Sequence, residues 1–550
     1  MILQIPAELT LRILCHLDLP DLLSASLTNS TLNNYVQTFQ VLQYRFLSHA
    51  ARIEDTPHTD VVVGERFERL KRREDGWARL NVDFSRSLPV HFDISGIYEL
   101  MGGIYLLGDS NRRKLHYCRL PSTPSDPLSW SFIDARCMYI DVGMNIYEHD
   151  LIAIVTSQLH PTNGAFHEIL VQFVEFSTGR PHPRAHNPIL PVAVTLTAHP
   201  SVGIEIVGNR LAVIIHHQRP THPDDTICVY DWQSGHLLLM LPHHGYAYAS
   251  LTFLSPTLLL LPRTASGVLD IWEIPSDNSA PPTTPRYALS LPRLSPSHFC
   301  ISLSCRGENN PTAPQPGAPK AQHAHHQPPF RTTANDSIVL LQMRTVKLEG
   351  DGWVSDEFSI FVTRGALLEV CQKWSAAESA GDDGVVALRW DQWGPGITRW
   401  IDASKTQTRW ITTSAGTRCV LTKSLGNDDF EDAAVREIDE GDNAPPPLRV
   451  LDFNSIVLRK LAGGNYVIDR SAVDIEVVTE PSTLVSEVFE EPVVSELPYV
   501  SFTPRNSTRF EGFESVLMDE DRLIGLRVDA DTQNVVGIEV MHIGTSASGE

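Results

Sequence analysis

The chain of 550 residues lacks a long hydrophobic run, and it lacks an excess of positive charge. Hydrophobic residues make up 42% of the sequence, yet no apolar stretch approaches the roughly 18 residues that a membrane-spanning helix needs. The sequence has 44 Lys and Arg against 66 Asp and Glu, a formal net charge of -22. Such a charge repels nucleic acid phosphates and anionic lipid heads. We therefore expect a folded chain with neither nucleic acid nor membrane as a main partner.

Paired cysteines and known catalytic motifs are also missing. The eight cysteines are scattered without a CxxC pair, which is typical of a reducing compartment. Glu8 and Arg12 interrupt the opening MILQIPAELTLRIL, so we expect no secretory signal. No G-x-S-x-G elbow, H-E-x-x-H helix, Walker-type loop or G-x-G-x-x-G fingerprint occurs. We expect a cytoplasmic or nuclear protein without catalytic residues, cofactor or metal.

The sequence does have a surplus of apolar residues near its start. A first helix is predicted by Leu9, Ile13, Leu14 and Leu17, and Pro20 opens a second that carries Leu22, Leu23 and Leu27. A third helix is predicted by an apolar stripe over residues 32 to 46, with Asn29 among the available caps. Three helices in about 40 residues are at the lower limit of what folds alone. A partner protein or the chain's own large domain must cover the remaining apolar surface.

The stretch IPAELTLRILCHLDLPDLLSASLT resembles an F-box. The resemblance rests on Ile5-Pro6, Glu8-Leu9, Ile13-Leu14, Leu17, Pro20 and Leu22-Leu23. It implies binding to a Skp1-like adaptor and, through that adaptor, to the cullin of an SCF-type ubiquitin ligase. The residues that it implies for Skp1 contact are Ile5, Pro6, Leu9, Ile13, Leu14, Leu17, Leu22 and Leu23.

A basic stretch, GERFERLKRREDGWARL at 64 to 80, predicts a solvated helix rather than a nucleic acid patch. Glu65 and Arg69 stand at the i, i+4 spacing that stabilises an exposed helix face. Phe67, Leu70 and Trp77 form the inner stripe. We place this helix among linker helices at 49–94, between a helical module at 1–48 and the long remainder at 95–550.

The remainder reads as short strands separated by turn clusters. Sets of strands with turns such as Ser177-Thr178-Gly179 recur every 45 to 60 residues or so, which is typical of propeller blades, and VYDWQSG resembles the end of a WD-type third strand. About 450 residues supply roughly seven blades, and closing the ring removes exposed strand edges. The alternative is another all-β architecture, such as a β-sandwich. The predicted fold is therefore mainly β, with a small all-α N-terminal module.

Two segments interrupt the strand pattern. Residues 306–336 are rich in Pro, Ala and Gln and predict a disordered insertion, in which His323, His325 and His326 lack the fixed geometry of a metal site. Residues 426–447 predict an acidic, solvated loop. Segments such as WDQWGPGITRWI and VLMDEDRLIGLRV resemble the F-box family expanded in mushroom-forming fungi, and this resemblance implies a propeller-like body without assigning any ligand residue.

Two further groups have a structural and a functional interpretation. Asp519, Glu520 and Asp521 precede RLIGLRV as a turn precedes a strand, which we favour over a cation site or an acid/base pair. Four tryptophans either recognise a peptide or sugar or pack between blades: Trp390, Trp393, Trp400 and Trp410.

Together these features predict a non-catalytic substrate-recognition subunit of a ubiquitin ligase, with the propeller binding an unknown target protein. One alternative is an enzyme with its active site at the central opening of the propeller and an N-terminal helical cap. That alternative requires convergent His, Asp or Glu side chains with perturbed protonation. The other alternative is an interaction scaffold without a ligase role.

Overall fold

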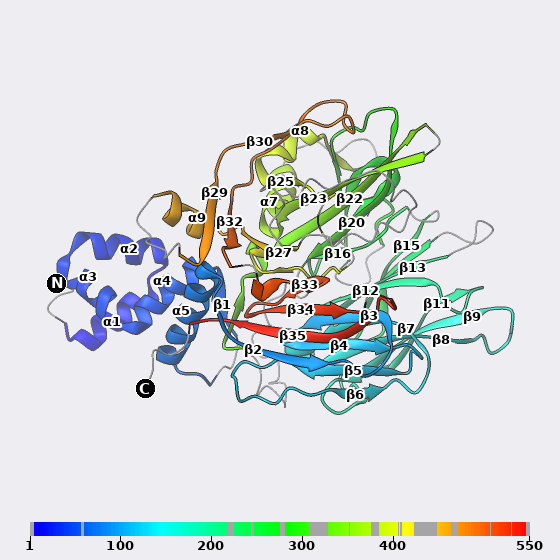
Figure 1. The fold of residues 1–550 in the computed structure, drawn as a ribbon, viewed down its shortest axis with the longest axis horizontal. Helices are drawn as coiled ribbons and strands as arrows, with labels where there is room; N and C mark the ends of the chain where they lie inside the picture. The colour runs from blue at the N-terminus through cyan, green and yellow to red at the C-terminus, as the bar shows by residue number, and fades with distance from the viewer. Residues whose placement is uncertain are drawn as a thin grey trace.

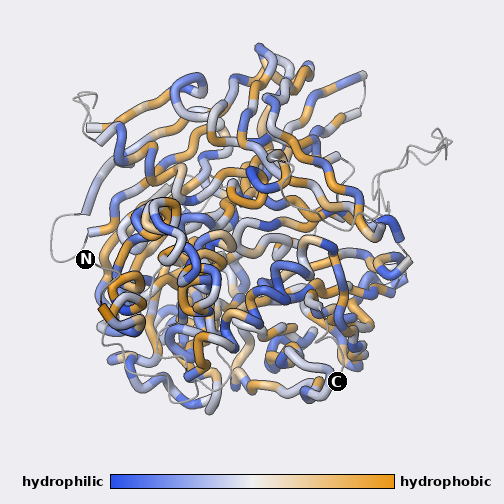
Figure 2. The backbone as a smooth tube through the Cα atoms, turned by 90° about the vertical axis from the view of Figure 1, so that its left-hand side faces the viewer, coloured by the Kyte–Doolittle hydropathy of each residue, from blue (hydrophilic) through white to orange (hydrophobic). Residues whose placement is uncertain are grey.

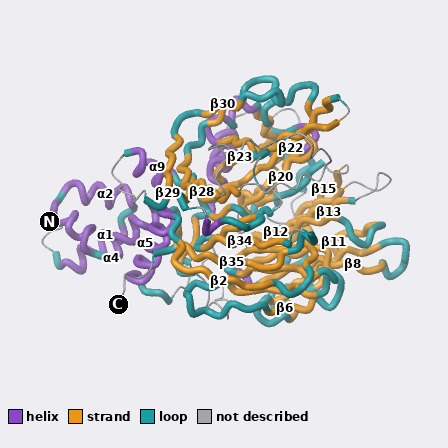
Figure 3. The backbone as a smooth tube through the Cα atoms, in the orientation of Figure 1, coloured by secondary structure: helices purple, strands orange, loops and turns teal. Residues whose placement is uncertain are grey.

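Helices occupy the first part of the chain, and strands occupy most of the rest (Figure 3). The computed structural model describes residues 5–56, 60–217, 225–243, 247–275, 281–307, 328–350, 352–375, 384–404, 406, 410–422, 448–463, 471–506, 508–529 and 531–545. Figure 1 shows the N-terminal helices at one end of the molecule and the sheets filling the other end. The acidic loop predicted at 426–447 and the three histidines at 323–326 lie outside the described residues.

Four short helices build the N-terminal module, and a fifth joins it to the sheets. They are α1 (Ala7–His16), α2 (Leu19–Thr28), α3 (Ser30–Thr38), α4 (Gln40–Ala50) and α5 (Val63–Arg79). The carboxylate of Asp18 caps α2 by accepting from the Asp21 N–H at 2.8 Å, and Asn29 caps α3 by accepting from the Thr31 N–H at 2.8 Å.

The prediction of one continuous third helix is wrong. The backbone of Phe39 is extended, with φ -90° and ψ 112°, so it ends α3 and begins α4. No Gly or Pro marks this break in the sequence. The reason is packing, because the turn at Phe39 folds α4 back onto the first two helices. There the Arg45 guanidinium donates to the carbonyl oxygens of Leu14 and Cys15, each at 3.1 Å.

Seven sheets follow one another along the chain as blades, and their strands pair antiparallel except for one parallel strand in blade 4. The first four are blade 1, with β3 (Ile94–Met101), β4 (Ile104–Asp109), β5 (Lys114–Arg119) and β6 (Ser131–Asp134); blade 2, with β7 (Tyr139–Asn145), β8 (Leu151–Leu159), β9 (His167–Glu175), β10 (Arg180–Pro181) and β11 (Ile189–Thr195); blade 3, with β12 (Ser201–Val207), β13 (Arg210–His216), β14 (Asp225–Asp231) and β15 (His236–His243); and blade 4, with β16 (Thr252–Ser255), β17 (Leu258–Arg263), β18 (Val268–Glu273), β19 (Tyr287–Ser290) and the parallel β24 (Val386–Leu388).

The other blades contain longer connections. They are blade 5, with β20 (His298–Gly307), β22 (Ile338–Glu349), β23 (Gly352–Thr363) and β25 (Thr398–Asp402); blade 6, with β26 (Ser414–Ala415), β27 (Arg418–Thr422), β28 (Leu448–Asp452), β32 (Tyr499–Pro504) and β29 (Val473–Val478); and blade 7, with β33 (Ser515–Met518), β34 (Arg522–Val528), β35 (Val535–Ile543) and β2 (Val82–Pro89). Shorter elements between them are α6 (Ile146–His149), α7 (Arg364–Ser375), α8 (Trp390–Trp393), α9 (Ser455–Ala462), β30 (Ser482–Leu484) and β31 (Val493–Ser495).

Blade 7 joins the two ends of the strand region. Its outer strand β2 pairs with β35 from Val82 opposite Ile543 to Pro89 opposite Gly537. Side chains of blades 7 and 1 share one hydrophobic cluster, so the series of blades closes on itself. The prediction of a propeller with roughly seven blades is confirmed. The prediction that 49–94 contains only linker helices is wrong for β2, whose alternating burial is that of a strand.

The boundary of the predicted insertion also needs correction. Residues 330 to 332 form β21 (Phe330–Thr332), which pairs antiparallel with β1 (Ile53–Asp55) between α4 and α5. Phe330 is buried in a cluster with Tyr44 and Leu70. An aromatic side chain at the end of the Pro-rich stretch thus ties the insertion to the N-terminal module, and the predicted disorder does not extend to residue 336.

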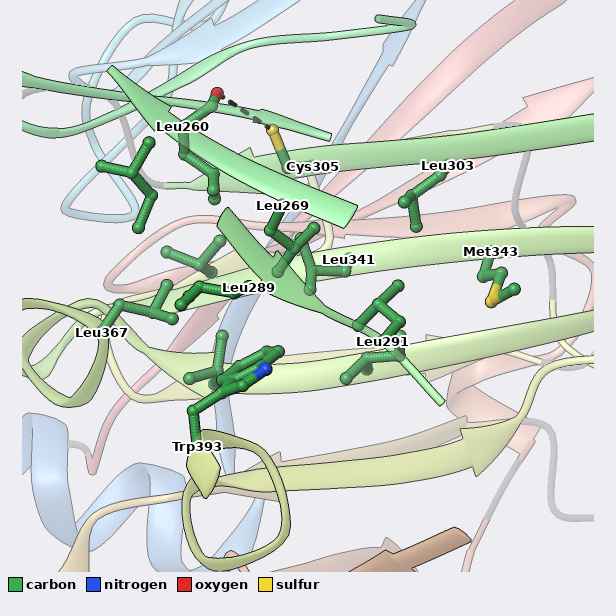
Figure 4. Close-up of a cluster of buried hydrophobic side chains, with 14 of the residues drawn as sticks. Leu260, Leu269, Leu289, Leu291, Leu303, Cys305, Leu341, Met343, Leu367 and Trp393 are labelled. Atoms are coloured by element: carbon green, nitrogen blue, oxygen red, sulfur yellow. Dashed lines mark hydrogen bonds between the residues drawn. The ribbon is translucent and has the colours of Figure 1, made fainter. Parts of the chain in front are cut away.

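The core lies between neighbouring blades. Figure 4 shows leucines from β17, β18 and β19 of blade 4 meeting Leu303, Leu341 and Met343 of blade 5. The Cys305 thiol there faces the Leu260 carbonyl oxygen at 3.9 Å. In Figure 2, seen from the side of the helices, hydrophobic and hydrophilic stretches alternate along the tube. Strands that other blades cover on both faces are buried along most of their length, as β4 and β8 are.

Charged contacts hold α5 on the propeller. Glu74 of α5 forms ion pairs with Arg73 at 3.0 Å and with Arg418 of blade 6 at 2.5 Å. Arg418 also pairs with Asp452 at 3.0 Å, and its guanidinium lies over the Trp77 ring. Although burial opposes ionisation of Glu74, the two arginines hold its pKa below the ordinary value. The helical module is therefore fixed to one end of the propeller rather than tethered loosely.

Candidate functional site

An apolar face covers the outer side of the first two helices. Leu9 and Ile13 of α1 are 51% and 43% exposed, and Leu23 and Leu27 of α2 are 49% and 79% exposed. Each pair stands at i, i+4, so its two side chains share one helix face. We call these four residues the α1–α2 face. Burying a leucine side chain completely contributes about 1.5–3 kcal/mol, so this face is a strong candidate for a partner surface.

The residues predicted for Skp1 contact divide into an outer and an inner set. Leu9, Ile13, Leu23 and Pro6 are exposed, and Ile5 and Leu17 are partly buried. Leu14 and Leu22 are 3% and 0% exposed, because they form the core of the module with Val36 and Leu42. The sequence left open which of the eight residues face outward, and the structure places Leu14 and Leu22 in the core of the module, where they offer no surface to a partner. Helical spacing identifies the apolar positions of a short helix, but it does not tell which of two apolar faces turns inward.

A central cavity of about 500 Å³ forms the second candidate site. The inner strand of every blade contributes to its lining, namely β3, β7, β12, β16, β20, β26 and β33. The cavity reaches an exposed position at Ser201, at the start of β12. Toward the helices it is lined by Arg331 and Thr332 of β21 and by the turn Asp519–Asp521. The cavity therefore runs along the centre of the propeller.

Three carboxyl groups with raised pKa line this cavity. Burial and the neighbouring Asp141 carboxylate raise the pKa of Glu99 to about 7. Burial raises the pKa of Asp141 to about 7. Burial also raises the pKa of Glu205 to about 8, although the nearby Arg364 acts to lower it. Glu205 accepts from the Thr252 hydroxyl and the Phe253 N–H, each at 3.2 Å.

Arg306 of β20 supplies a cation to the same space. Burial lowers the pKa of Arg306, although the nearby Glu99 and Asp141 act to raise it. Its Nε has no hydrogen-bond partner among the described residues.

Sequence reasoning missed these charged residues, although a signal was present. Glu99, Asp141 and Glu205 stand in the inner strands of three consecutive blades, in the contexts YEL, IDV and IEI. An acidic residue between apolar neighbours, repeated once in each of three blades, marks positions that face one shared axis. Alignment of the repeats on their first strands would have grouped them.

The other flagged residues have structural roles. Asp519, Glu520 and Asp521 form the turn between β33 and β34, as favoured, and Asp519 pairs with Arg522 at 2.8 Å. Trp393, Trp400 and Trp410 are 4–5% exposed and pack in the core. In the described ranges, no group of three or more His, Cys, Asp or Glu side chains is arranged to hold a metal ion. None of the helices within those ranges has the length and hydropathy that a bilayer crossing requires.

Comparisons with known proteins identify the helical module. The family model for the F-box domain matches residues 2–44. No curated protein matches the sequence at a significant level.

Among solved structures, BamB from Moraxella catarrhalis is 11% identical, with 83% of this chain and 98% of that chain covered and a TM-score of 0.31. YCF48 bound to D1 peptide is 9% identical, with 83% and 94% covered and a TM-score of 0.31. The WD40 β-propeller domain of Doa1 is 10% identical, with 57% and 88% covered and a TM-score of 0.25. At such scores these matches carry no argument, so the propeller assignment rests on the strand pairing itself.

The molecule thus joins a small helical module to a large ring of sheets. It contains an N-terminal F-box domain, and a seven-bladed β-propeller follows that domain.

Proposed function

We propose that this chain is the substrate-recognition subunit of an SCF-type ubiquitin ligase. The α1–α2 face binds a Skp1-like adaptor, the adaptor binds a cullin, and the propeller binds a target protein. The proposal rests mainly on one observation: the matched F-box domain exposes Leu9, Ile13, Leu23 and Leu27 on the end of the molecule that projects from the propeller (Figure 1). Such a complex works in the cytoplasm or the nucleus.

The physical basis of this function is proximity. A receptor that holds both adaptor and target raises the effective concentration of target lysines near the activated thioester, without supplying a reacting group. A fixed orientation of the two modules favours this role, because a target on the propeller then keeps a constant position relative to the adaptor. The ion pairs of Glu74 and Arg418 and the pairing of β1 with β21 provide that fixed orientation.

The test is co-purification of the full chain with Skp1, before and after the double substitution Leu9→Asp and Ile13→Asp. Both residues are exposed, so the variant is expected to fold and to lose adaptor binding by at least about tenfold, since two desolvated charges replace apolar contacts. Leu14→Asp is unsuitable, because Leu14 is buried and its loss would unfold the module. Unchanged Skp1 binding by the double variant contradicts the proposal.

A matched control is Val485→Asp, which places the same charge on an apolar residue that is 79% exposed on the propeller. It leaves adaptor binding unchanged. Ubiquitin transfer to a bound protein in the reconstituted ligase then separates a ligase receptor from an interaction scaffold, since a scaffold binds the adaptor without transfer.

The enzyme alternative requires a reactive group at the central opening. Glu99, Asp141 and Glu205 do converge there with raised pKa. However, burial raises the pKa of the cavity thiol Cys305 to about 12, so it is protonated and unreactive at neutral pH. The three carboxyl groups meet the requirement of the enzyme alternative, and we propose that they bind a ligand rather than react with one.

A further inference from the structure

Two carboxyl groups in the central cavity have unused hydrogen-bonding capacity. Oε1 of Glu99 accepts from the Leu100 N–H at 3.3 Å, and Oδ1 of Asp141 accepts from the Val142 N–H at 2.8 Å. Among the described residues, no donor reaches the second oxygen of either group. The two side chains belong to the inner strands of neighbouring blades and line the same cavity, and the Asp141 carboxylate raises the pKa of Glu99. A donor-rich ligand can therefore bind to both.

Asn145 adds a third acceptor deeper in the same cavity. Its side chain is 1% exposed, its Nδ2 donates to Glu148 at 3.3 Å, and its Oδ1 has no partner among the described residues. An unpaired buried carbonyl costs about 1–3 kcal/mol, so a ligand donor there is stabilising. Asn145 follows Asp141 by four residues on β7, which separates their Cα atoms by about 13 Å. The acceptors thus extend along the cavity rather than surrounding one point.

The charge of the lining selects the sign of the ligand. Seven acidic side chains and four arginines line the cavity among the described residues, so the lining carries an excess of three negative charges once Glu99, Asp141 and Glu205 are ionised at alkaline pH. Arg306 is the arginine whose charge acts on both Glu99 and Asp141, yet it donates no hydrogen bond to either within the described part of the chain. A metal ion does not fit, because no metal-binding cluster exists in that part.

We propose that the central cavity binds an aliphatic cation, with its ammonium or guanidinium group held between Glu99 and Asp141. The cation is either a free polyamine or the basic side chain of a bound protein, since both present the same group. This site is separate from the α1–α2 face and does not depend on adaptor binding.

Several charged groups face the pair and set its pH response. Glu99 is influenced by Asp141 and Arg306, and Asp141 is influenced by Arg112 and Arg306. Glu205 adds a further acidic group next to Glu99. Because the pair must ionise to attract a cation, binding strengthens as the pH rises through about 7.

The experiment is isothermal titration of the full chain with spermidine, with N-acetyl-lysine methylamide and with a neutral diol of similar length. We expect saturable spermidine binding at pH 8, with Kd about tenfold higher at pH 6, since a carboxyl group of pKa near 7 changes from about 90% to about 10% ionised. Binding of the lysine derivative as well identifies a protein side chain as a natural occupant; binding of spermidine alone identifies a free polyamine. Absence of binding by both cations, or equal binding of the diol, overturns the proposal.

Two variants change the affinity in opposite directions. Glu99→Gln with Asp141→Asn removes the charge while keeping shape, and it raises the spermidine Kd at pH 8 by at least about tenfold. Arg306→Gln removes the competing internal cation and lowers that Kd, an effect that a general structural defect does not produce. Asp391→Asn is the control, since its carboxylate is 65% exposed outside the cavity. The double substitution Leu9→Asp and Ile13→Asp retains spermidine binding, which distinguishes failure of this proposal from failure of the adaptor proposal.

Discussion

The F-box module and the propeller bury their apolar side chains in different ways. The module has four fully buried apolar residues in one small cluster, Leu14, Leu22, Val36 and Leu42, and exposes the α1–α2 face. In the propeller every sheet has a neighbouring blade on both faces, and only the edge strands of the separate blades remain unpaired on one side. The comparison teaches that the short helical bundle encloses only one small apolar cluster, whereas the propeller encloses large clusters between its blades and exposes single apolar side chains such as Phe299 and Trp353.

The electrostatics of the two regions differ in the same way. Polar groups of the helical module are mostly exposed, as in the caps Asp18 and Asn29. The propeller instead encloses charge, both at its junction with α5 and in its central cavity. Enclosed charges need partners, and the first and last of the following predictions test this requirement.

The largest effect is expected at the junction between the two regions. Arg418→Met leaves Asp452 buried without its cation and leaves Glu74 with Arg73 alone, and removal of one partner from a buried pair costs about 3–5 kcal/mol. We expect a loss of that size in the free energy of unfolding, measured by urea denaturation.

The control for this prediction is Arg389→Met, because Arg389 pairs with Asp391 at 3.0 Å with both side chains largely exposed. Exposed pairs contribute about 0–1 kcal/mol. Equal destabilisation by the two substitutions would show that the junction is not held by buried charge.

The second prediction concerns two adjacent leucines of α2. Leu22→Ala opens a cavity in the core of the module and is expected to cost about 2–5 kcal/mol, whereas Leu23→Ala at a half-exposed position is expected to cost about 0.5 kcal/mol or less. Thermal denaturation followed by helical circular dichroism measures both. If the two substitutions cost the same, the division into an inner and an outer face is incorrect.

The periodicity of apolar residues predicted which segments form helices and strands, but it did not predict which other parts of the chain those segments contact. The apolar stripe at i, i+4 identified α1 and α2, and recurrent strand sets identified the propeller. The break at Phe39 and the strand β2 were missed, because both depend on contacts with distant residues rather than on local propensity.

The candidate sites show the same limit. Three of the four residues of the α1–α2 face were among the predicted contact residues, and Leu27 was not. The same prediction also included Leu14 and Leu22, which are buried. Glu99, Asp141 and Glu205 were not predicted, because separate blades bring them together across more than a hundred residues of sequence. Local patterns carry no information on such convergence until the repeats are aligned.

The smallest effect is expected from pH and tests the enclosed charge of the propeller. The folded-state pKa of Glu205 is about 8, above its ordinary value of 4.5. Between these values the folded chain binds more protons than the unfolded chain, so the contribution of Glu205 to stability is complete below about pH 4.5 and falls as the pH rises through about 8. Glu205→Gln keeps the shape of the side chain and cannot ionise.

We therefore expect Glu205→Gln to gain about 1–3 kcal/mol of stability over the parent chain when the pH rises from 5 to 8, measured by urea denaturation at both values. Glu487→Gln is the control, since its side chain is 86% exposed, and its difference from the parent stays constant with pH. A parallel pH profile for Glu205→Gln and the parent would mean that Glu205 ionises freely in the folded chain. The contrast between a helical module that exposes its polar groups and a propeller that encloses its charged groups would then not hold for Glu205.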